Sequence, residues 1–302
     1  MTEALYGASG FYTAGDGPAA HFQTSAHQPV FAEAVLSLLR RCRLQRVVDV
    51  GAGRGELLGR LHRLDPTLAL HGVDVVPRPG ALPAAIGWSA QRPVLDDALV
   101  MANEWLDTLP VEIVASTVDG LRTVLVDGGG NEALGPAPDA ADRAWLDRWW
   151  SAAQRAEVGR SRDEAWADLA AATRRGVLVA IDYAHTLGSR PVAGSLSAYR
   201  RGRQVRPVPD GSCDLTAQVA LDACADAARV AGADPGILLD QRDVLAALGI
   251  SAPEPASRSA YDRLVAAGRA TAVGELTDPA GLGTFTWLVQ PVGLPAPLQP
   301  PD

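Results

Sequence analysis

The sequence has few of the residues that build disulfide frameworks or metal sites. Its three cysteines include no C-x-x-C pair and are odd in number, which argues against both a disulfide framework and a zinc site. The five histidines include no H-E-x-x-H pair or comparable spacing. We therefore predict reduced cysteines and no bound metal.

The chain also lacks long apolar segments and an excess of positive charge. No run approaches the roughly 18 uninterrupted apolar residues of a membrane span, and no positively charged segment followed by an apolar one opens the chain. A formal net charge of -8 argues against a surface that binds phosphate backbones or anionic membranes. These absences predict a cytoplasmic protein that binds neither nucleic acid nor membrane.

Enough apolar residues are present to build a packed core. Of the 302 residues, 47% are apolar and 21% are charged, which is typical of a globular protein. No internal repeat and no linker between two cores is visible in the sequence. We therefore predict a single domain over residues 1–290, followed by a flexible Pro-rich tail over residues 291–302.

The most informative segment is a glycine loop that follows an apolar run. Residues 47–50 are typical of a buried strand, and Gly51, Gly53 and Gly55 lead from it into a helix predicted over residues 55–64. Glycines let backbone N–H groups approach a ligand closely, and the N-terminus of a helix offers unpaired donors. We therefore expect this loop to hold a nucleotide.

The residue after the third glycine indicates which nucleotide is bound. A dinucleotide fold uses G-x-G-x-x-G or a final Ala, whereas this chain has Glu56 at the last place. The segment that begins at Asp49 reads D-x-G-x-G-x-G, which resembles the pattern of class I methyltransferases, and these bind S-adenosylmethionine. We expect Asp49 to lie beside the methionine moiety, because its ammonium group favours a carboxylate.

A further acid supports an adenosine-containing ligand. A strand is predicted over residues 69–75, and Asp74 lies at its end. On the neighbouring parallel strand, a carboxylate at that place can accept hydrogen bonds from ribose hydroxyls. A dinucleotide fold has an acid there too, so Asp74 does not decide between the two cofactors.

A second polar group follows the fourth predicted strand. Residues 98–102 form a continuous apolar run, typical of a strand buried on both faces, and Asn103, Glu104 and Asp107 come after it. Ligands of open α/β sheets bind at the carboxyl ends of the strands, so the two acids could face a nucleophile aligned with the transferred methyl group. Alternatively, Asn103 caps a helix and the two acids interact with the helix dipole.

The next part of the chain predicts an insertion over residues 110–175. Two β-prone runs, over residues 111–117 and 122–126, indicate a hairpin. Two helices are then predicted, over about residues 141–157 and 162–174.

The chain then returns to the sheet and leaves it again. A buried strand is predicted over residues 176–181. Residues 184–213 are rich in Gly, Pro and Arg and are expected to form a long loop that lines the site. Asp214 is expected to cap a helix that runs to about Val230.

Taken in this order, the motifs resemble those of the MidA-type methyltransferases, which include a mitochondrial complex I assembly factor that acts as a protein arginine methyltransferase. The resemblance spans most of the chain and is carried by residues 21–25 leading to Phe31, residues 49–55, Asn103-Glu104 with Asp107 and Leu109-Pro110, Asp182-Tyr183, residues 194–196 with Tyr199-Arg200, and residues 214–217. It implies that Asn103-Glu104 and the loop through Gly194 and Asp214 lie around the methyl-transfer site.

The chain departs from that family pattern at three positions. Ala184, Ser195 and Gln218 stand where glycine, threonine and histidine are commoner. If the histidine takes part in proton transfer in the relatives, Gln218 changes that step here.

Together these observations predict an α/β protein with the class I S-adenosylmethionine-dependent methyltransferase fold, a Rossmann-like, mostly parallel seven-stranded sheet with a hairpin and helical insertion. The predicted cofactor-binding residues are Asp49, Gly51, Gly53, Gly55, Asp74 and Asn103, and the predicted catalytic residues are Glu104 and Asp107. The resemblance implies an arginine on a protein partner as the acceptor. Two alternatives remain open: a binding or assembly factor that keeps the cofactor fold without turnover, and an NAD(P)-dependent oxidoreductase, which Glu56 disfavours.

Overall fold

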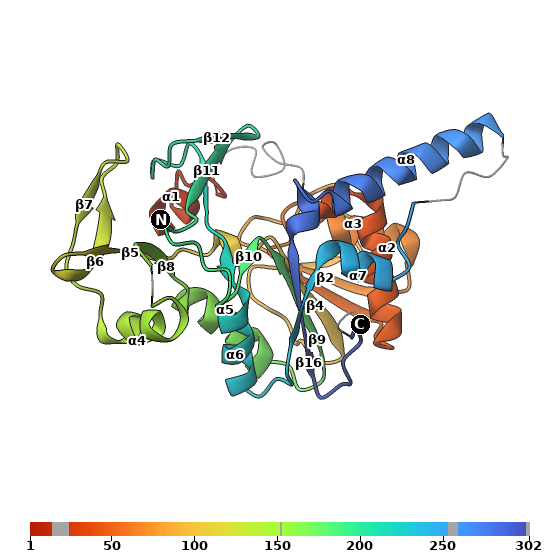
Figure 1. Cartoon of the computed structure of the whole chain (residues 1–302). Helices are drawn as coiled ribbons and strands as arrows, with labels where there is room; N and C mark the ends of the chain where they lie inside the picture. Colours follow the sequence, from red (N-terminus) through yellow and green to blue (C-terminus); the bar gives the residue numbers. More distant parts are fainter. Residues whose placement is uncertain (14–23, 152, 253–258, 300–302) are drawn as a thin grey trace. The chain divides into compact units, whose positions relative to one another are not determined.

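Seven strands form the central sheet: β1 (Arg46–Val50), β2 (Ala69–Val73), β3 (Gly87–Ser89), β4 (Ala98–Asn103), β9 (Gly176–Asp182), β15 (Ile237–Asp240) and β16 (Thr286–Val292). The structure is a computed structural model that describes residues 1–13, 24–151, 153–252 and 259–299. The strand order is β15-β16-β9-β4-β1-β2-β3. Figure 1 labels β2, β4, β9 and β16 of this sheet. The pairs β1/β2, β1/β4, β2/β3 and β4/β9 are parallel, and β15 and β16 are antiparallel. The predicted mostly parallel seven-stranded sheet is thereby confirmed.

The chain divides into two compact units. The sheet unit comprises Gln23–Asn103, Ala172–Ile181 and Ala233–Asp302. The insertion unit comprises Met1–Phe22, Glu104–Ala171 and Asp182–Gly232. Neither unit is a continuous stretch of sequence.

The strand order of the sheet reverses between β1 and β4. Strands β2 and β3 lie on one side of β1, and β4 and β9 lie on the other. Asp49 of β1 is in register with Gly72 of β2 and with Met101 of β4. Open α/β sheets bind ligands beyond the carboxyl ends of the strands at the point of reversal. The topology therefore places the ends of β1, β2 and β4 at the ligand-binding edge.

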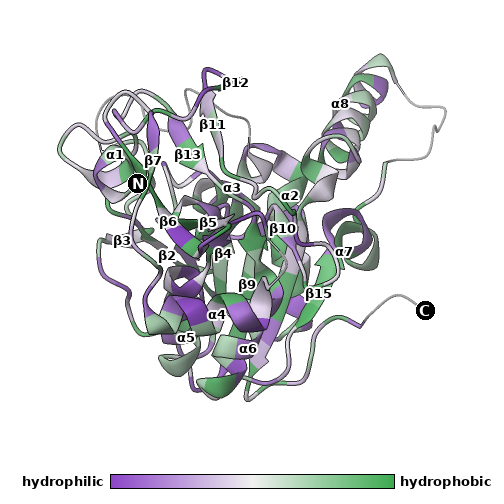
Figure 2. Ribbon diagram, turned by 60° about the vertical axis from the view of Figure 1, so that its left-hand side comes forward, coloured by the Kyte–Doolittle hydropathy of each residue, from purple (hydrophilic) through white to green (hydrophobic). Residues whose placement is uncertain are grey.

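Strands β4 and β9 are apolar because side chains on both of their faces are buried. Residues 98–102 and 176–181 are all buried, although successive side chains of a strand point to opposite faces. Both strands are coloured as hydrophobic in Figure 2. The continuous apolar runs of the sequence therefore predicted the central strands correctly.

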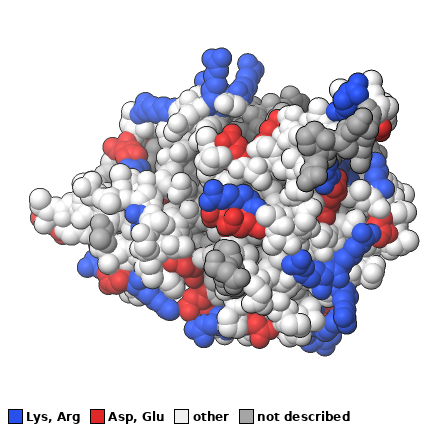
Figure 3. Space-filling view, turned by 45° about the vertical axis from the view of Figure 1, so that its right-hand side comes forward, with Lys and Arg blue, Asp and Glu red and all other residues white. Residues whose placement is uncertain are grey.

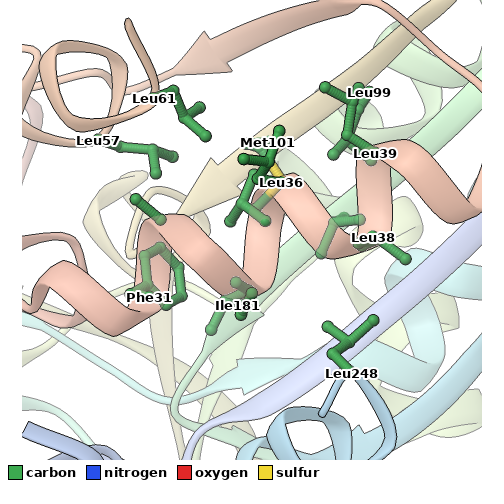
Figure 4. Close-up of a cluster of buried hydrophobic side chains, with 14 of the residues drawn as sticks. Phe31, Leu36, Leu38, Leu39, Leu57, Leu61, Leu99, Met101, Ile181 and Leu248 are labelled. Carbon is green, nitrogen blue, oxygen red and sulfur yellow. The ribbon is translucent and has the colours of Figure 1, made fainter. Parts of the chain in front are cut away.

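Helix α2 (Pro29–Arg41) forms much of the core of the sheet unit. The apolar residues of this segment recur at helical spacing, which predicts a helix from Pro29 to Arg41, and the structure agrees. Pro29 occupies the first turn, where a missing N–H costs no hydrogen bond. Figure 4 shows its apolar side chains against those of α3 (Glu56–Leu64), β4 and β9. Helices α7 (Gln241–Ala247) and α8 (Ala260–Thr277) and the 3-10 helices η2 (Ser25–His27) and η4 (Leu282–Thr284) complete this unit.

The insertion unit contains a second, four-stranded sheet. Its strands are β5 (Glu112–Thr117), β6 (Gly120–Val126), β7 (Glu132–Leu134) and β8 (Arg155–Val158), in the order β7-β6-β5-β8 with antiparallel pairs. The β5–β6 hairpin agrees with the prediction. Helices α4 (Ala140–Trp149), α5 (Arg160–Ala171) and α6 (Leu221–Val230) belong to the same unit (Figure 1).

Residues 184–213 are not the structureless loop that the composition suggested. They contain β10 (Ala184–His185), β11 (Ser197–Arg200) and β12 (Arg203–Val205). Strand β11 pairs with β12 and with β13 (Asp214–Thr216), and β10 pairs with β14 (Val219–Ala220). The composition of this segment hid these strands, because they are only two to four residues long and contain few apolar residues.

The prediction that Asp214 caps a helix is wrong. Asp214 begins strand β13 and pairs with Tyr199 of β11, and the helix that follows begins at Leu221. Residues 1–27 show no clear periodicity, which predicts a loop before the first core helix, but the described part of this segment contains helix α1 (Thr2–Tyr6). Its buried side chains pack with those of β11 and β13, and this contact supplies the apolar partner that the segment lacks in isolation.

Other boundaries differ by several residues. Helix α4 ends at Trp149 rather than near residue 157, because strand β8 begins at Arg155 and pairs with β5. Strand β15 was not predicted. In the proposed tail, β16 runs to Val292 and Leu298 is buried, whereas residues 300–302 lie outside the described residues. Residues 21–23 of the N-terminal motif also lie outside them.

The surface carries both signs of charge. On the face in Figure 3, basic and acidic side chains are interspersed. All 27 basic residues are arginines, since the chain contains no lysine. None of the helices in the described ranges is both long enough and apolar enough to cross a membrane.

Candidate active site

The glycine loop after β1 has a backbone that only glycine adopts readily. Gly51, Gly53 and Gly55 have φ angles of 72°, 57° and 75°, in the left-handed region. A Cβ atom on Gly55 would lie 2.7 Å from Cδ1 of Leu82, so the side chain of a larger residue would displace Leu82. The conformation of the loop therefore requires glycine at these positions, while the close approach of a ligand to its backbone stays a prediction.

Asp74 holds this loop from the end of β2. Its Oδ2 accepts a hydrogen bond from the Gly53 N–H at 2.8 Å, and its Oδ1 accepts one from the Val76 N–H at 3.0 Å. Burial raises the pKa of Asp74, and these amide hydrogen bonds oppose the rise. Each carboxylate oxygen keeps a further lone pair for a ligand.

Asp49 is a buried carboxyl with acidic neighbours. It is 4% exposed, and burial, with smaller contributions from Asp74 and Glu56, raises its pKa to about 8. A nearby cation would favour the charged form of Asp49 and lower this pKa. The site is therefore electrostatically complementary to a ligand with a positive group.

Glu56, which argued against a dinucleotide, interacts with the same loop. Its Oε2 accepts a hydrogen bond from the Arg54 N–H at 3.1 Å, and its Oε1 lies 3.8 Å from Nε2 of His27. A small residue at this position, as in the dinucleotide pattern, would remove both interactions.

Asn103 and Glu104 are consecutive, one at the end of the sheet unit and one at the start of the insertion unit. Asn103 is the last residue of β4 and is half-buried. Glu104 adopts a φ of 52°, which is uncommon for a residue with a side chain. Such strain concentrates at functional sites. The alternative in which Asn103 caps a helix is not observed, since the 3-10 helix η3 (Leu106–Thr108) begins after Trp105.

Asp107 is buried within η3. Its Oδ2 accepts a hydrogen bond from the Thr216 hydroxyl at 2.9 Å. Burial raises the pKa of Asp107, while this hydrogen bond and the charge of Arg162 oppose the rise. Asp107 therefore lies among groups from distant parts of the sequence.

Arg162 of α5 is fully buried beside this cluster. Its Nη2 donates to the Asp107 main-chain oxygen at 2.8 Å, and its Nη1 donates to the Gln218 main-chain oxygen at 2.9 Å. The guanidinium thus joins η3 to the segment after β13. It binds main-chain carbonyls, so the neighbouring carboxyls keep their own capacity to accept.

Asp214 and Tyr12 extend the cluster. The Tyr12 hydroxyl donates to Oδ1 of Asp214 at 2.7 Å, and burial, with a smaller contribution from Asp107, raises the pKa of Asp214 to about 7. Tyr12 stacks on Tyr6, whose hydroxyl donates to Oγ1 of Thr108 at 2.9 Å. The N-terminal segment therefore contacts both η3 and β13.

Sequence reasoning did not assign roles to several of these residues. Asp182 was noted only as part of a motif, and Arg162, Tyr6 and Tyr12 were not singled out as site residues. The signal available for Asp182 was its place after a buried strand, like that of Asp49 and Asn103. No local pattern marks the others.

A family model of S-adenosyl-L-methionine-dependent methyltransferases matches residues 63–238. The chain belongs to this family. The match includes Asp74, Asn103, Glu104 and Asp107, and the family includes MidA, so the predicted resemblance is confirmed.

Two solved structures from Burkholderia thailandensis are similar to this methyltransferase over nearly its whole length. One, bound to S-adenosyl-homocysteine, is 25% identical, and the alignment covers 97% of this chain and 86% of that chain with a TM-score of 0.82. The other, a native structure of an uncharacterized protein, has the same identity and coverage and a TM-score of 0.78. No protein in the curated set matches the chain. These findings favour methyl transfer over the two alternatives that the sequence left open.

The cofactor of the methyltransferase is S-adenosyl-L-methionine, and the residues at the end of β1 fit it. Its ammonium group supplies the positive charge that the buried Asp49 lacks, and the glycine loop leaves room for close approach. When bound, the cofactor supplies an activated methyl group on a sulfonium. The assignments of Asp49, Gly51, Gly53, Gly55 and Asp74 to its binding remain predictions.

Proposed function

We propose that this methyltransferase transfers a methyl group to an arginine side chain of a protein partner, with Glu104 and Asp107 at the acceptor. The observation that carries the proposal is the set of carboxyl groups in the insertion unit. It consists of Glu104, Asp107, Asp182 and Asp214, and the cation among them, Arg162, donates to main-chain carbonyls. Such a set favours a cationic acceptor.

The chemistry of a guanidinium matches these groups. A free arginine is protonated at neutral pH and presents its N–H donors in a planar fork, which carboxylates bind bidentately. One nitrogen must lose a proton as it attacks the methyl carbon. We assign orientation of the guanidinium to Glu104 and acceptance of the proton to Asp107.

Alignment supplies most of the expected rate. The attacking nitrogen, the methyl carbon and the sulfur must lie in line, and holding them so replaces the entropy cost of a random encounter. Glu104 is suited to this task because its strained backbone fixes its direction at the end of β4.

We also propose that both units belong to one methyltransferase domain over residues 1–290. The chain crosses between the units five times, as the boundaries of the two units require. A domain boundary usually falls where few crossings occur, in a single linker. A partner protein and a cytoplasmic location are likewise proposals, based on the resemblance and on the composition.

The test incubates the protein with radiolabelled S-adenosylmethionine and a lysate from cells that lack the gene. We expect a labelled protein band whose hydrolysate contains methylarginine. Asp49→Ala should abolish the band by weakening cofactor binding, and Glu104→Gln should weaken it by about 100-fold without loss of cofactor affinity. Asp96→Asn, which changes a carboxyl that pairs with Arg174, is the matched control.

The absence of lysine helps to interpret the labelling. Self-methylation would give a band at the 31.5 kDa of the chain itself, and its label could not be methyllysine. Label only in small molecules, or in protein residues other than arginine, would contradict the proposed acceptor.

A further inference from the structure

Asp107 and Asp182 are two buried carboxyl groups of the insertion unit that lie next to each other. One oxygen of each group has no hydrogen-bond donor among the described residues. Asp182 is completely buried, and its Oδ1 lies 3.4 Å from the main-chain N–H of Asp107, which donates to it. In the described part of the chain, Oδ2 of Asp182 and Oδ1 of Asp107 have no hydrogen-bond donor. Both oxygens are shielded from solvent as well.

Two ionised carboxylates cannot occupy this arrangement at low cost. A buried acceptor without a donor loses its hydration without compensation, and two like charges at short range repel each other. A single proton between the two groups removes both problems, because the protonated carboxyl donates to the ionised one. Carboxyl pairs that share one proton are known from acid–base sites.

The other groups around the pair do not supply that proton. The Thr216 hydroxyl donates to the other oxygen of Asp107. Nη1 and Nη2 of Arg162 donate to main-chain carbonyls. Nε of Arg162 is buried and has no acceptor among the described residues. Among the described residues, the titratable and charged groups that interact with the pair are Glu104, Tyr183, Asp214, Tyr12, Cys224 and Arg162. Two of these groups, Glu104 and Asp214, are carboxyls, and their negative charge disfavours a second charge on the pair.

We propose that Asp107 and Asp182 share one proton and that Asp182 is a positioning residue, which holds this proton and thereby orients and tunes Asp107 for the methyl transfer. The inference rests on the proposed role of Asp107 as the proton acceptor. Asp182 is the member that carries the proton, since burial, together with the charge of Asp107, raises its pKa well above the usual range. Burial raises the pKa of Asp107, and the hydrogen bond from Asp182 is one of the interactions that oppose this rise and favour the ionised form of Asp107.

The proton balance of the transfer is then complete. The lone pair of the acceptor nitrogen forms a bond to the methyl carbon, and the carbon–sulfur bond breaks with its electron pair left on the sulfur, which becomes a neutral thioether. The proton of the acceptor nitrogen moves to the free lone pair on Oδ2 of Asp107 and leaves to solvent afterwards. The shared proton stays with Asp182 throughout.

The first test needs no acceptor. Infrared difference spectra at pH 8, wild type minus Asp182→Asn and wild type minus Asp107→Asn, should show the C=O stretch of one protonated carboxyl. At this pH Asp163 and Asp214, with pKa values of about 6 and 7, are mostly ionised. Asp49, with a pKa of about 8, is partly protonated in the wild type and in both variants, so its band cancels in the difference spectra. Asp163→Asn, a buried carboxyl of the same unit bonded to Trp145 and Cys224, should not remove the band. Absence of this band from both difference spectra would overturn the proposal, whatever the acceptor is.

The second test is the pH profile of kcat/KM for methyl transfer. Asp182→Ala removes the donor to Asp107, so the acid limb should move up by about one pH unit and kcat should fall by at least tenfold. Asp182→Asn keeps an N–H donor and should recover most of the rate with its acid limb near that of the wild type. Thermal melts and circular dichroism check that each variant is folded. If the Ala and Asn variants lose equal activity with unshifted profiles, Asp182 is only structural.

Discussion

The Asp74 carboxylate accepts the main-chain N–H of Gly53 at 2.8 Å, and this hydrogen bond joins the end of β2 to the glycine loop after β1. Both parts are predicted to touch the cofactor, one through the ribose and the other through the loop amides. This hydrogen bond therefore couples the conformation of the loop to Asp74, which is expected to bind the ribose hydroxyls.

Asp74→Asn should weaken cofactor binding. The NH₂ group of the asparagine replaces one of the two carboxylate oxygens, so the N–H of either Gly53 or Val76 loses its acceptor. The amide also lacks the negative charge that strengthens hydrogen bonds from the ligand's hydroxyl groups. We expect the Kd for S-adenosyl-homocysteine to rise about 10- to 100-fold, or about 1.4 to 2.8 kcal/mol, by isothermal titration calorimetry. Asp96→Asn, which lies just before β4 and pairs with Arg174, should leave the Kd unchanged. An unchanged Kd in Asp74→Asn would remove Asp74 from the cofactor site.

Gly55→Ala should destabilise the protein, whereas Gly59→Ala should not. Gly55 has a φ of 75°, and a Cβ there would lie 2.7 Å from Leu82, so the substitution adds backbone strain and a clash. Gly59 lies inside α3, and its nearest atom to a new Cβ is 3.9 Å away. We expect Gly55→Ala to cost about 1 to 3 kcal/mol and Gly59→Ala to gain about 0.5 to 1 kcal/mol in urea unfolding. Equal effects of the two substitutions would contradict the strained conformation of the loop.

The ligand-free protein should lose stability as the pH rises from about 4 to about 8, and Asp49 should contribute to this loss. In the unfolded chain the pKa of an aspartate is about 3.9, whereas in the fold burial raises the pKa of Asp49 to about 8. Between these values the native state binds the proton that the unfolded state releases, so stability falls with pH and levels off above about 8. The difference between the free energies of unfolding at pH 5 and at pH 8, measured by urea unfolding, should be smaller in Asp49→Asn than in the wild type, by several kcal/mol at most.

The same group makes cofactor binding depend on pH. A cation beside Asp49 lowers its pKa, so S-adenosyl-homocysteine should bind with release of a proton near pH 7. Calorimetry in two buffers of different ionisation enthalpy measures this release. If the wild type and Asp49→Asn release the same number of protons on binding, the ammonium group does not interact with Asp49.

Glu104→Gly should be more stable than Glu104→Ala. The φ of 52° at Glu104 costs strain with any Cβ and little with glycine, so the difference in the free energy of unfolding should be about 1 kcal/mol. Both variants should lose methyl transfer, because both lose the carboxylate, while their affinity for the cofactor stays at the wild-type value. Gly120→Ala is the control, because it adds backbone strain and removes no functional group. Gly120 has a φ of 104°, and a new Cβ there would have no atom within 4 Å. If Glu104→Ala is as stable as Glu104→Gly, the backbone at Glu104 is not strained.

Local patterns in the sequence were sufficient for the elements on both sides of the glycine loop and for the central strands of the sheet. The bounds of α2 and β4 were predicted to within one residue, because apolar periodicity and a proline at the first helical turn act within a few residues. Predictions failed where a strand is short or is stabilised by a distant partner. Strand β8 pairs with β5 across about 40 residues, and β13 pairs with β11 inside a segment whose composition resembles a loop.

The sequence by itself determined the glycine loop, the acids at the ends of β1 and β2, and hence the class of cofactor, because each of these depends on residues that are close together in the chain. Only the tertiary structure decided which carboxyl groups share an environment. Asp107 meets Asp182 across 75 residues and Thr216 across 109. Burial and hydrogen-bond partners of this kind arise from long-range packing, and no local spacing encodes them.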